Sequence, residues 1–174
     1  AKTVQGSAAA FLNFLADAKG PLFRGLATGR RKRQLLMEEI RGSGPRDYDT
    51  ATRQDDRVPM HPARVIAEAR RGYPDDTVAV VDSGSHRAFA AAHWEARGPR
   101  RYLSATDIGP MGAAIPLTIG AAAANPDAPH LCITSDGCML MHGMELHTAV
   151  QHGTRMTLLV LINGSYGNIW YRAH

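Results

Sequence analysis

The chain of 174 residues is 44% hydrophobic and 21% charged and carries a formal net charge of +4, the profile of a globular protein with a proper core. No apolar run approaches the roughly 18 residues that a membrane-spanning helix needs, and the N-terminus lacks the organisation of a signal peptide. The two cysteines, Cys132 and Cys138, lack the spacing of a zinc site. We therefore expect a reduced, cytoplasmic protein that does not bind membranes.

Basic residues are concentrated in the first half of the chain, in "GRRKRQ" (29–34) and "EARRG" (68–72). A nucleic-acid-binding surface usually interleaves such residues with aromatic side chains. No aromatic residue lies between Phe23 and Tyr48. The basic residues are therefore expected to form a solvated or partner-facing surface, and no nucleic-acid partner is predicted.

The first 72 residues are predicted to form helices and a linker. Residues 5–18 place Phe and Leu side chains on one helical face, and residues 29–41 are typical of a charged helix. Residues 42–60 are polar and rich in helix-breaking residues, which predicts a linker. A further helix is expected over residues 60–72, with Pro62 near its start.

From residue 77 onward, short apolar strands alternate with helices. The last two strands are continuous apolar runs, typical of strands buried on both faces of a parallel sheet. We therefore predict an α/β fold, a parallel sheet flanked by helices, in a domain over residues 61–174. The expected elements are a strand at 77–82, helices at 86–96 and 109–126, a strand at 130–134, a crossover helix at 144–153 and a strand at 156–162.

An aspartate and an asparagine follow the last two predicted strands. Asp136 follows the first and Asn163 follows the second, 163 − 136 = 27 positions later. Because the carboxyl ends of parallel strands meet at one edge of a sheet, the two side chains are expected to converge. Their oxygens suit Mg²⁺, and Gly137 offers a backbone N–H to a phosphate. Alternatively, Asp136 caps a helix and Asn163 with Gly164 forms a turn.

Four segments, in the right order, resemble the thiamine diphosphate-dependent enzymes. "SDG" (135–137) and "NGSYG" (163–167) resemble the "GDG…NN" signature of that family. "DSGSH" (82–86) resembles the loop that touches the cofactor diphosphate in acetolactate synthase-like members. "GPMG" (109–112) resembles the segment that holds the cofactor in its bent shape.

The resemblance covers roughly residues 75–172 and implies the pyrophosphate-binding domain of such an enzyme. Residues 1–41 then correspond to the end of a central domain, and further elements are expected to follow His174. FAD in the central domain stays an open alternative, which no residue in this part of the chain supports.

By the same resemblance, Asp136, the Asn163 side chain and the Ser165 carbonyl would bind Mg²⁺. Asp136 would thus hold the cofactor through the metal ion rather than cap a helix alone. The residues that would line the diphosphate are Gly84, Ser85, His86, Gly137 and Cys138.

The resemblance also implies contacts with the thiamine part of the cofactor. Met111 would lie beneath the thiazolium ring, and the Gly109 carbonyl would accept a hydrogen bond from the aminopyrimidine. Without its place in "GPMG", Met111 would be interpreted as a core residue. The cofactor supplies the chemistry in such enzymes, and the protein supplies orientation and electrostatics.

Three positions depart from the family pattern. Ser135 stands where a glycine is usual, and Ile162 stands where the first asparagine of the pair is usual. A tryptophan that shapes the substrate pocket in biosynthetic acetohydroxyacid synthases would fall at Arg172. Our hypothesis is that Arg172 faces an anionic substrate group; the alternative is a solvent-facing arginine.

The function implied is acetolactate synthase-like decarboxylation of a 2-oxo acid, with pyruvate expected, followed by carboligation. A glutamate from a pyrimidine-binding domain, usually on a neighbouring subunit, would activate the cofactor, so a dimer or tetramer is expected. No segment here matches that domain, and the chain alone would then supply only the diphosphate and Mg²⁺ half of the site. The alternatives are a simple 2-oxo-acid decarboxylase, a sulfonate- or phosphonate-handling relative, and a non-catalytic cofactor-binding or assembly subunit. A dinucleotide-binding domain is not supported, because no GxGxxG follows a strand.

Overall fold

The computed structural model describes residues 7, 29, 31–36, 38–39 and 50–173. The chain divides into two compact units, Ala1–Tyr48 and Asp49–His174. The described residues between 29 and 39 are helical, in agreement with the charged helix expected at 29–41. The helix expected at 5–18 lies outside the described residues.

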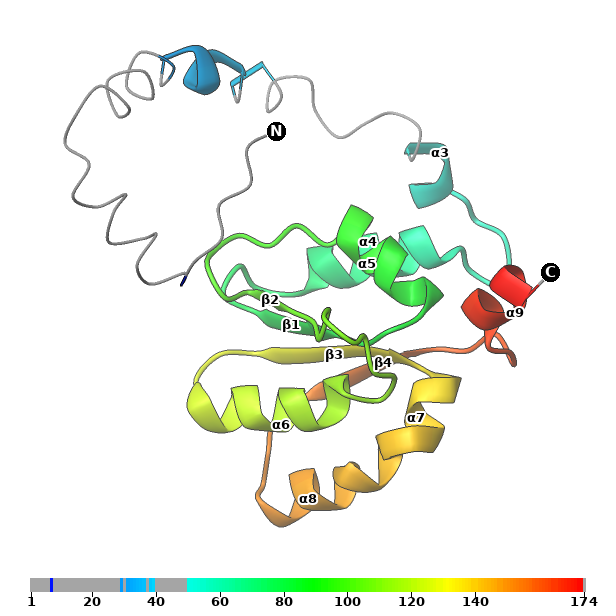
Figure 1. Cartoon of the computed structure of the whole chain (residues 1–174). Coiled ribbons are helices and arrows are strands. Elements are labelled where there is room, and N and C mark those ends of the chain that lie inside the picture. Colours follow the sequence, from blue (N-terminus) through cyan, green and yellow to red (C-terminus); the bar gives the residue numbers. More distant parts are fainter. Residues whose placement is uncertain (1–6, 8–28, 30, 37, 40–49, 174) are drawn as a thin grey trace. The chain divides into compact units, whose positions relative to one another are not determined.

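The second unit is built on a sheet of parallel strands in the order β2-β1-β3-β4 (Figure 1). Every strand pair is parallel, and Val81 of β1 lies opposite Ile133 of β3. The sequence therefore predicted the fold class correctly. The strands are β1 (Val78–Val81), β2 (Tyr102–Leu103), β3 (His130–Ser135) and β4 (Thr157–Leu161).

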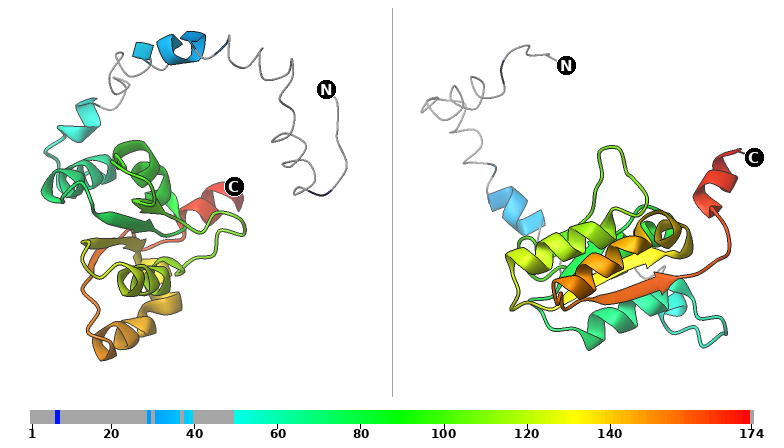
Figure 2. Two further views of the ribbon diagram at one scale, coloured as in Figure 1. Left: turned by 90° about the vertical axis from the view of Figure 1, so that its left-hand side faces the viewer. Right: turned by 90° about the horizontal axis from the view of Figure 1, so that it is seen from below.

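Helices cover both faces of this sheet (Figure 1). On one face lie α4 (Pro62–Gly72) and α5 (Ser85–His93), which pack against each other. On the other lie α6 (Ala114–Ala124), α7 (Asp136–His142) and α8 (Leu146–Gln151), and Figure 2 shows α6 and α8 side by side. The remaining elements of this unit are the helices α3 (Thr50–Arg53) and α9 (Gly167–Ala173) and the 3₁₀ turn η2 (Gly143–Glu145).

Alternation along the strands creates two cores, one on each face. Ala79 and Val81 of β1 pack with Ile66 of α4 and Trp94. Val78 and Val80 point the other way, toward α6. None of the described helices is long and apolar enough to cross a membrane.

Several expected boundaries were wrong. The helix predicted at 109–126 begins only at Ala114, because Gly109 (φ 67°) and Gly112 (φ 86°) adopt left-handed backbone conformations that a helix cannot include. The crossover helix expected at 144–153 instead starts at Asp136 as α7 and continues through η2 and α8. The short strand β2 was not predicted.

The strand β4 is less buried than its apolar sequence indicated. Its residues are half-buried or exposed, whereas β3 is buried along almost its whole length. The reason is position: β4 lies at the edge of the described sheet and pairs only with β3. The expectation that both runs are buried on both faces was therefore right for β3 and wrong for β4.

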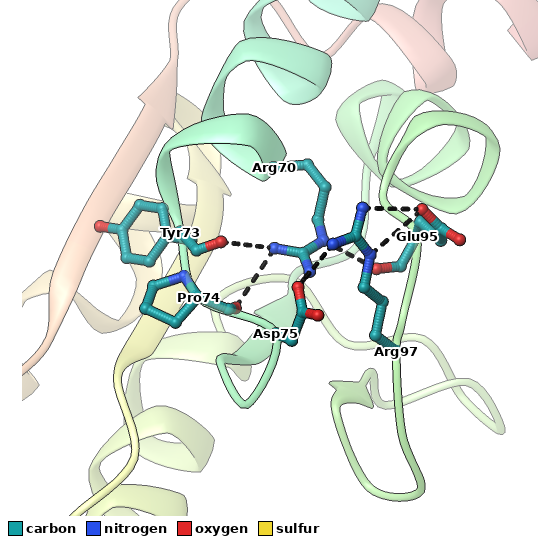
Figure 3. Close-up of polar contacts among 6 residues, drawn as sticks. All are labelled: Arg70, Tyr73, Pro74, Asp75, Glu95 and Arg97. Carbon is teal, nitrogen blue, oxygen red and sulfur yellow. Dashed lines mark hydrogen bonds and ion pairs between the residues drawn. The ribbon is translucent and has the colours of Figure 1, made fainter.

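One of the basic residues expected on a solvated surface is buried. Arg70 of α4 is 7% exposed, and its guanidinium lies 5.2 Å from the centre of the Trp94 ring. Its nitrogens donate to the backbone carbonyls of Tyr73, Pro74 and Glu95, and to the carboxylate of Asp75 (Figure 3). This network ties the end of α4 to the segment after α5, so Arg70 stabilises the fold.

Candidate functional site

A pocket of about 420 Å³ opens at the carboxyl edge of the sheet. Loops after β1, β3 and β4 supply its polar side, and α4, α5 and the end of β4 supply an apolar side. This is the edge at which open α/β sheets bind ligands. The lining residues are Met60, Pro62, Val65, Ser83, Gly84, Ser85, His86, Phe89, Met111, Ser135, Gly137, Val160, Leu161, Ile162, Asn163, Ser165, Tyr166, Gly167, Asn168 and Ile169.

The first turn of α5, directly after the loop that follows β1, places a buried histidine against the pocket. His86 is 5% exposed, and its Nε2 has no hydrogen-bond partner within the described part of the chain. Burial lowers the pKa of His86, and the nearby carboxylates of Asp82 and Asp136 act in the opposite direction. Gly84 has φ 152°, and a Cβ there would lie 2.6 Å from the His86 ring. The loop thus leaves a buried polar nitrogen for a ligand to satisfy.

Gly137, at the start of α7, has two side chains packed directly on it. A Cβ at this position would lie 2.7 Å from the Tyr166 ring and 3.2 Å from the Met111 methyl group. Met111 comes from the turn before α6, and Tyr166 from the segment after β4. Three separate segments therefore meet at this part of the pocket.

Asp136 and the loop after β4 converge, as the strand spacing predicted. The Gly164 N–H donates to Asp136 Oδ2 at 2.8 Å, and Ser165 N–H donates to Asn163 Oδ1 at 3.1 Å. Ser135 and Leu161 are paired across the sheet, so the two strands end at the same level. The cap of α7 is Ser135, whose Oγ accepts from the Cys138 N–H.

The donor set at this convergence fits a hard cation. Asp136 offers a carboxylate, and the loop it contacts offers the amide oxygen of Asn163 and the backbone carbonyl of Ser165. Such oxygens would suit Mg²⁺, which commonly takes one or two carboxylates and leaves other positions to phosphates and water. No group of three or more His, Cys, Asp or Glu side chains gathers as a metal site in the described residues. A site of the zinc type is therefore not present in that part of the chain.

The structure brings most of the predicted site residues to one pocket. Gly109, Asp136 and Cys138 are not among its lining residues: Cys138 is buried, and its thiol donates to the Ser83 carbonyl at 3.2 Å. Asp136 contacts the loop that lines the pocket, and the side chain of Arg172 lies outside the described residues. The predicted residues that line the pocket are Gly84, Ser85, His86, Met111, Gly137, Asn163 and Ser165.

Sequence analysis missed the buried carboxylate of Asp82. It is 2% exposed and accepts hydrogen bonds from Ser83 N–H (2.9 Å), Gly112 N–H (2.8 Å) and Thr134 Oγ1 (2.9 Å). The available signal was its position, since Asp82 directly follows the apolar strand β1 just as Asp136 directly follows β3.

Two polar residues that follow β4 were given no role from the sequence. Tyr166 and Asn168 line the pocket, and Ser85 Oγ lies 3.0 Å from Asn168 Oδ1. These contacts join residues more than eighty positions apart. No local pattern predicts them.

A comparison with known families matches residues 82–172 to the family described as "Thiamine pyrophosphate enzyme, C-terminal TPP binding domain". The match covers just over half of the chain. The chain belongs to this family. Thiamine pyrophosphate is the same compound as thiamine diphosphate, so the resemblance seen in the four sequence segments is confirmed.

Curated relatives point to the same group. The chain is 36% identical over 105 residues to a protein assigned as acetolactate synthase large subunit IlvB2 of Mycobacterium tuberculosis, covering 60% of the chain and 19% of the relative. It is 32% identical over 93 residues to acetolactate synthase isozyme 1 large subunit of Escherichia coli, covering 53% and 16%. It is 32% identical over 108 residues to sulfoacetaldehyde acetyltransferase of Alcaligenes xylosoxydans xylosoxydans, covering 62% and 18%.

Among solved structures, the fold is similar to an X-ray structure of a protein assigned as a thiamin diphosphate-dependent enzyme from Mycobacterium smegmatis. The TM-score is 0.58 at 24% identity, over 64% of this chain and 22% of that one. The likeness supports the predicted fold. The chain spans about a fifth of the length of the curated relatives it matches.

Proposed function

We propose that this chain forms the diphosphate- and Mg²⁺-binding half of an acetolactate synthase-like enzyme that acts on a 2-oxo acid. The observation that carries the proposal is the convergence of Asp136 with the Asn163–Ser165 loop beside a pocket that the family match covers. The relatives named acetolactate synthase support the reaction class.

In this proposal, Asp136, the Asn163 amide and the Ser165 carbonyl hold Mg²⁺. Charge favours this assignment, because a divalent cation offsets both the carboxylate and the ligand phosphates. The backbone N–H donor from Gly164 keeps the carboxylate of Asp136 beside the loop.

The loop after β1 and the start of α7 would hold the diphosphate. His86 offers its unpartnered Nε2, and Gly84, Ser85 and Gly137 line the pocket without large side chains. Cys138 is buried next to this loop, and its thiol donates a hydrogen bond to the Ser83 carbonyl. We propose that it supports the loop and touches the diphosphate only through its backbone.

Met111 would contact the thiazolium ring, and the Gly109 carbonyl would accept from the aminopyrimidine. Met111 lies against Gly137, and Gly109 lies near the Ser83 hydroxyl, so the turn is placed beside the diphosphate loop. When bound, thiamine diphosphate serves as the electron sink for cleavage next to a carbonyl. The chain itself binds and orients that group.

A complete site would need further parts. We propose that a pyrimidine-binding domain, on a second subunit of a dimer or tetramer, supplies the activating glutamate. Residues 1–41 would end a preceding central domain, and residues 42–60 would join it to the domain at 61–174. Pyruvate is the proposed substrate and the cytoplasm the proposed location.

The experiment uses the intact protein and measures thiamine diphosphate binding by calorimetry in the presence of Mg²⁺. Asp136→Ala should weaken the affinity about 100-fold, equivalent to about 2.7 kcal/mol. Asp76→Ala, at an exposed position before β1, is the control and should leave affinity unchanged. Unchanged affinity in Asp136→Ala would remove the proposed metal site.

A second candidate is a sulfonate-handling transferase, favoured by the similarity to sulfoacetaldehyde acetyltransferase. Under this proposal Arg172 would bind the anionic group through its paired donors. Turnover of pyruvate compared with that of sulfoacetaldehyde separates the two, and Arg172→Ala should reduce only the sulfonate reaction. A protein that binds the cofactor but turns over neither substrate would support a non-catalytic assembly subunit instead.

A further inference from the structure

The carboxylate of Asp82 holds together three segments that reach the pocket from different parts of the chain. Its Oδ1 accepts from the Ser83 N–H at 2.9 Å and from the Gly112 N–H at 2.8 Å. Its Oδ2 accepts from Thr134 Oγ1 at 2.9 Å. Ser83 begins the diphosphate loop, Gly112 ends the turn that carries Met111, and Thr134 lies two residues before Asp136.

The geometry explains why a carboxylate stands at this point. Val81 and Ile133 are register partners, so Asp82 lies level with Thr134 at the ends of the two central strands. The residue is 2% exposed and Thr134 is fully buried. A buried carboxylate is stable only when its oxygens receive hydrogen bonds, and the two backbone donors and one hydroxyl meet that need.

The turn that Asp82 holds is conformationally demanding. Gly109 and Gly112 both have positive φ, 67° and 86°, so the backbone reverses sharply around Met111. The Gly112 N–H bond to Asp82 anchors the end of this turn to β1. Met111 itself packs on Gly137, in the pocket.

We propose that Asp82 is a positioning residue that fixes the turn carrying Met111 relative to the diphosphate loop. The site then favours a ligand that has a ring system as well as a diphosphate. This inference rests on the proposed function, because it assumes that the ligand is thiamine diphosphate. Asp82 does not touch the ligand; it acts through Gly112 and Met111.

The test compares two probes on the intact protein, thiamine diphosphate and inorganic diphosphate, each with Mg²⁺. Asp82→Ala removes the acceptor for the Gly112, Ser83 and Thr134 donors but keeps the side chains of Asp136, Asn163 and His86. The ratio of the two affinities should fall by about tenfold, chiefly through weaker thiamine diphosphate binding. Asp82→Asn retains an acceptor for the two N–H groups and a donor for Thr134, so its ratio should stay within about threefold of the native value.

A double-mutant cycle separates positioning from general support of the fold. Met111→Ala should lower the affinity ratio in the native background but add little in the Asp82→Ala background, because the two residues act through one contact. If the two effects are additive, or if Asp82→Ala weakens both probes by the same factor, the positioning role is wrong.

Two further results are decisive. If Asp82→Ala does not fold, Thr134→Val replaces it: a fall in the ratio of about threefold supports the role, and an unchanged ratio overturns it. If the native protein binds neither probe, the proposed function fails and this inference fails with it. If the native protein prefers thiamine diphosphate and Asp82→Ala keeps that preference, only this inference fails.

Discussion

Two aspartates stand at the ends of the two central strands, and they have different environments. Asp82, after β1, is 2% exposed and accepts from two backbone N–H groups and a hydroxyl. Asp136, after β3, is half-buried and accepts from the Gly164 N–H. The first carboxylate accepts three hydrogen bonds from its own chain and has little exposed surface, whereas the second accepts one and reaches water.

The same sequence pattern therefore produces two different carboxylate environments. Each aspartate follows an apolar strand and precedes a small residue. Asp82 lies under the turn before α6, which closes over it and supplies a donor. Asp136 begins α7 beside an open pocket, where the facing loop is exposed. A buried carboxylate with three hydrogen bonds stabilises structure, and a partly exposed one is able to accept a cation.

Replacing each aspartate by alanine should separate the two roles, with the largest effect on stability at Asp82. Asp82→Ala leaves three donors without an acceptor and should lower the free energy of unfolding by about 3–5 kcal/mol. Asp136→Ala should lower it by less than about 1 kcal/mol, because the residue has one backbone donor and reaches water. Urea unfolding of the ligand-free protein measures both. Equal losses at the two positions would contradict the distinction.

The next largest effect is expected from a substitution at Gly137, and it is an effect on ligand affinity rather than on stability. Gly137→Ala places a methyl group 2.7 Å from the Tyr166 ring, so the pocket must rearrange. The affinity for thiamine diphosphate with Mg²⁺ should fall about tenfold, or about 1.4 kcal/mol.

The matched control is Gly120→Ala in α6, where a Cβ meets nothing within 4 Å. This change should leave binding intact and stabilise the helix slightly. Adding Tyr166→Ala to Gly137→Ala should recover part of the lost affinity. A Gly137→Ala protein with native affinity would show that Tyr166 moves aside without cost.

A smaller effect is expected from the hydroxyl that supports Asp82. Thr134→Val removes one donor from the carboxylate and should lower the free energy of unfolding by about 1–2 kcal/mol. Thr118→Val is the control, since Thr118 is equally buried but bonds the Ala114 carbonyl of its own helix at 2.6 Å. Thermal and urea unfolding compare the two variants. A larger loss for Thr118→Val would argue against a special role for the Asp82 network.

The smallest expected effect is a loss of stability at acidic pH. It arises from a histidine at the opposite edge of the sheet. His130, at the start of β3, is 3% exposed, and burial lowers its pKa from the ordinary 6.5. A lowered histidine pKa stabilises the fold above pH 6.5, and that contribution is lost as the pH falls below it. The urea midpoint should therefore fall between about pH 7.5 and 5.5, and fall less in His130→Gln. Parallel declines in the two proteins would exclude His130 as a source.

The fold and the position of the site were predictable because they depend on local patterns. Continuous apolar runs indicated parallel strands, and polar residues directly after them indicated the carboxyl edge. The convergence of Asp136 with the loop after β4 followed from one crossover unit between their strands. Four short motifs in order identified the family.

What was not predictable depends on contacts between distant segments. The bond from Gly112 to Asp82 spans thirty positions, and the packing of Tyr166 on Gly137 joins the ends of two strands. The two left-handed glycines that delay α6 have no effect on its apolar pattern. Arg70 was expected to be solvated because it is charged. The backbone carbonyls that accept its hydrogen bonds surround it only in the folded chain, so the sequence does not show them.

The most direct test of the central claim is a calorimetric titration of the intact protein with thiamine diphosphate, with Mg²⁺ present or removed by EDTA, and with thiamine as the control ligand. We predict saturable binding of thiamine diphosphate that depends on Mg²⁺, and much weaker binding of thiamine, because the proposed site would hold the diphosphate through a cation. Binding of thiamine diphosphate that persists unchanged in EDTA, or no binding at all, would contradict the account.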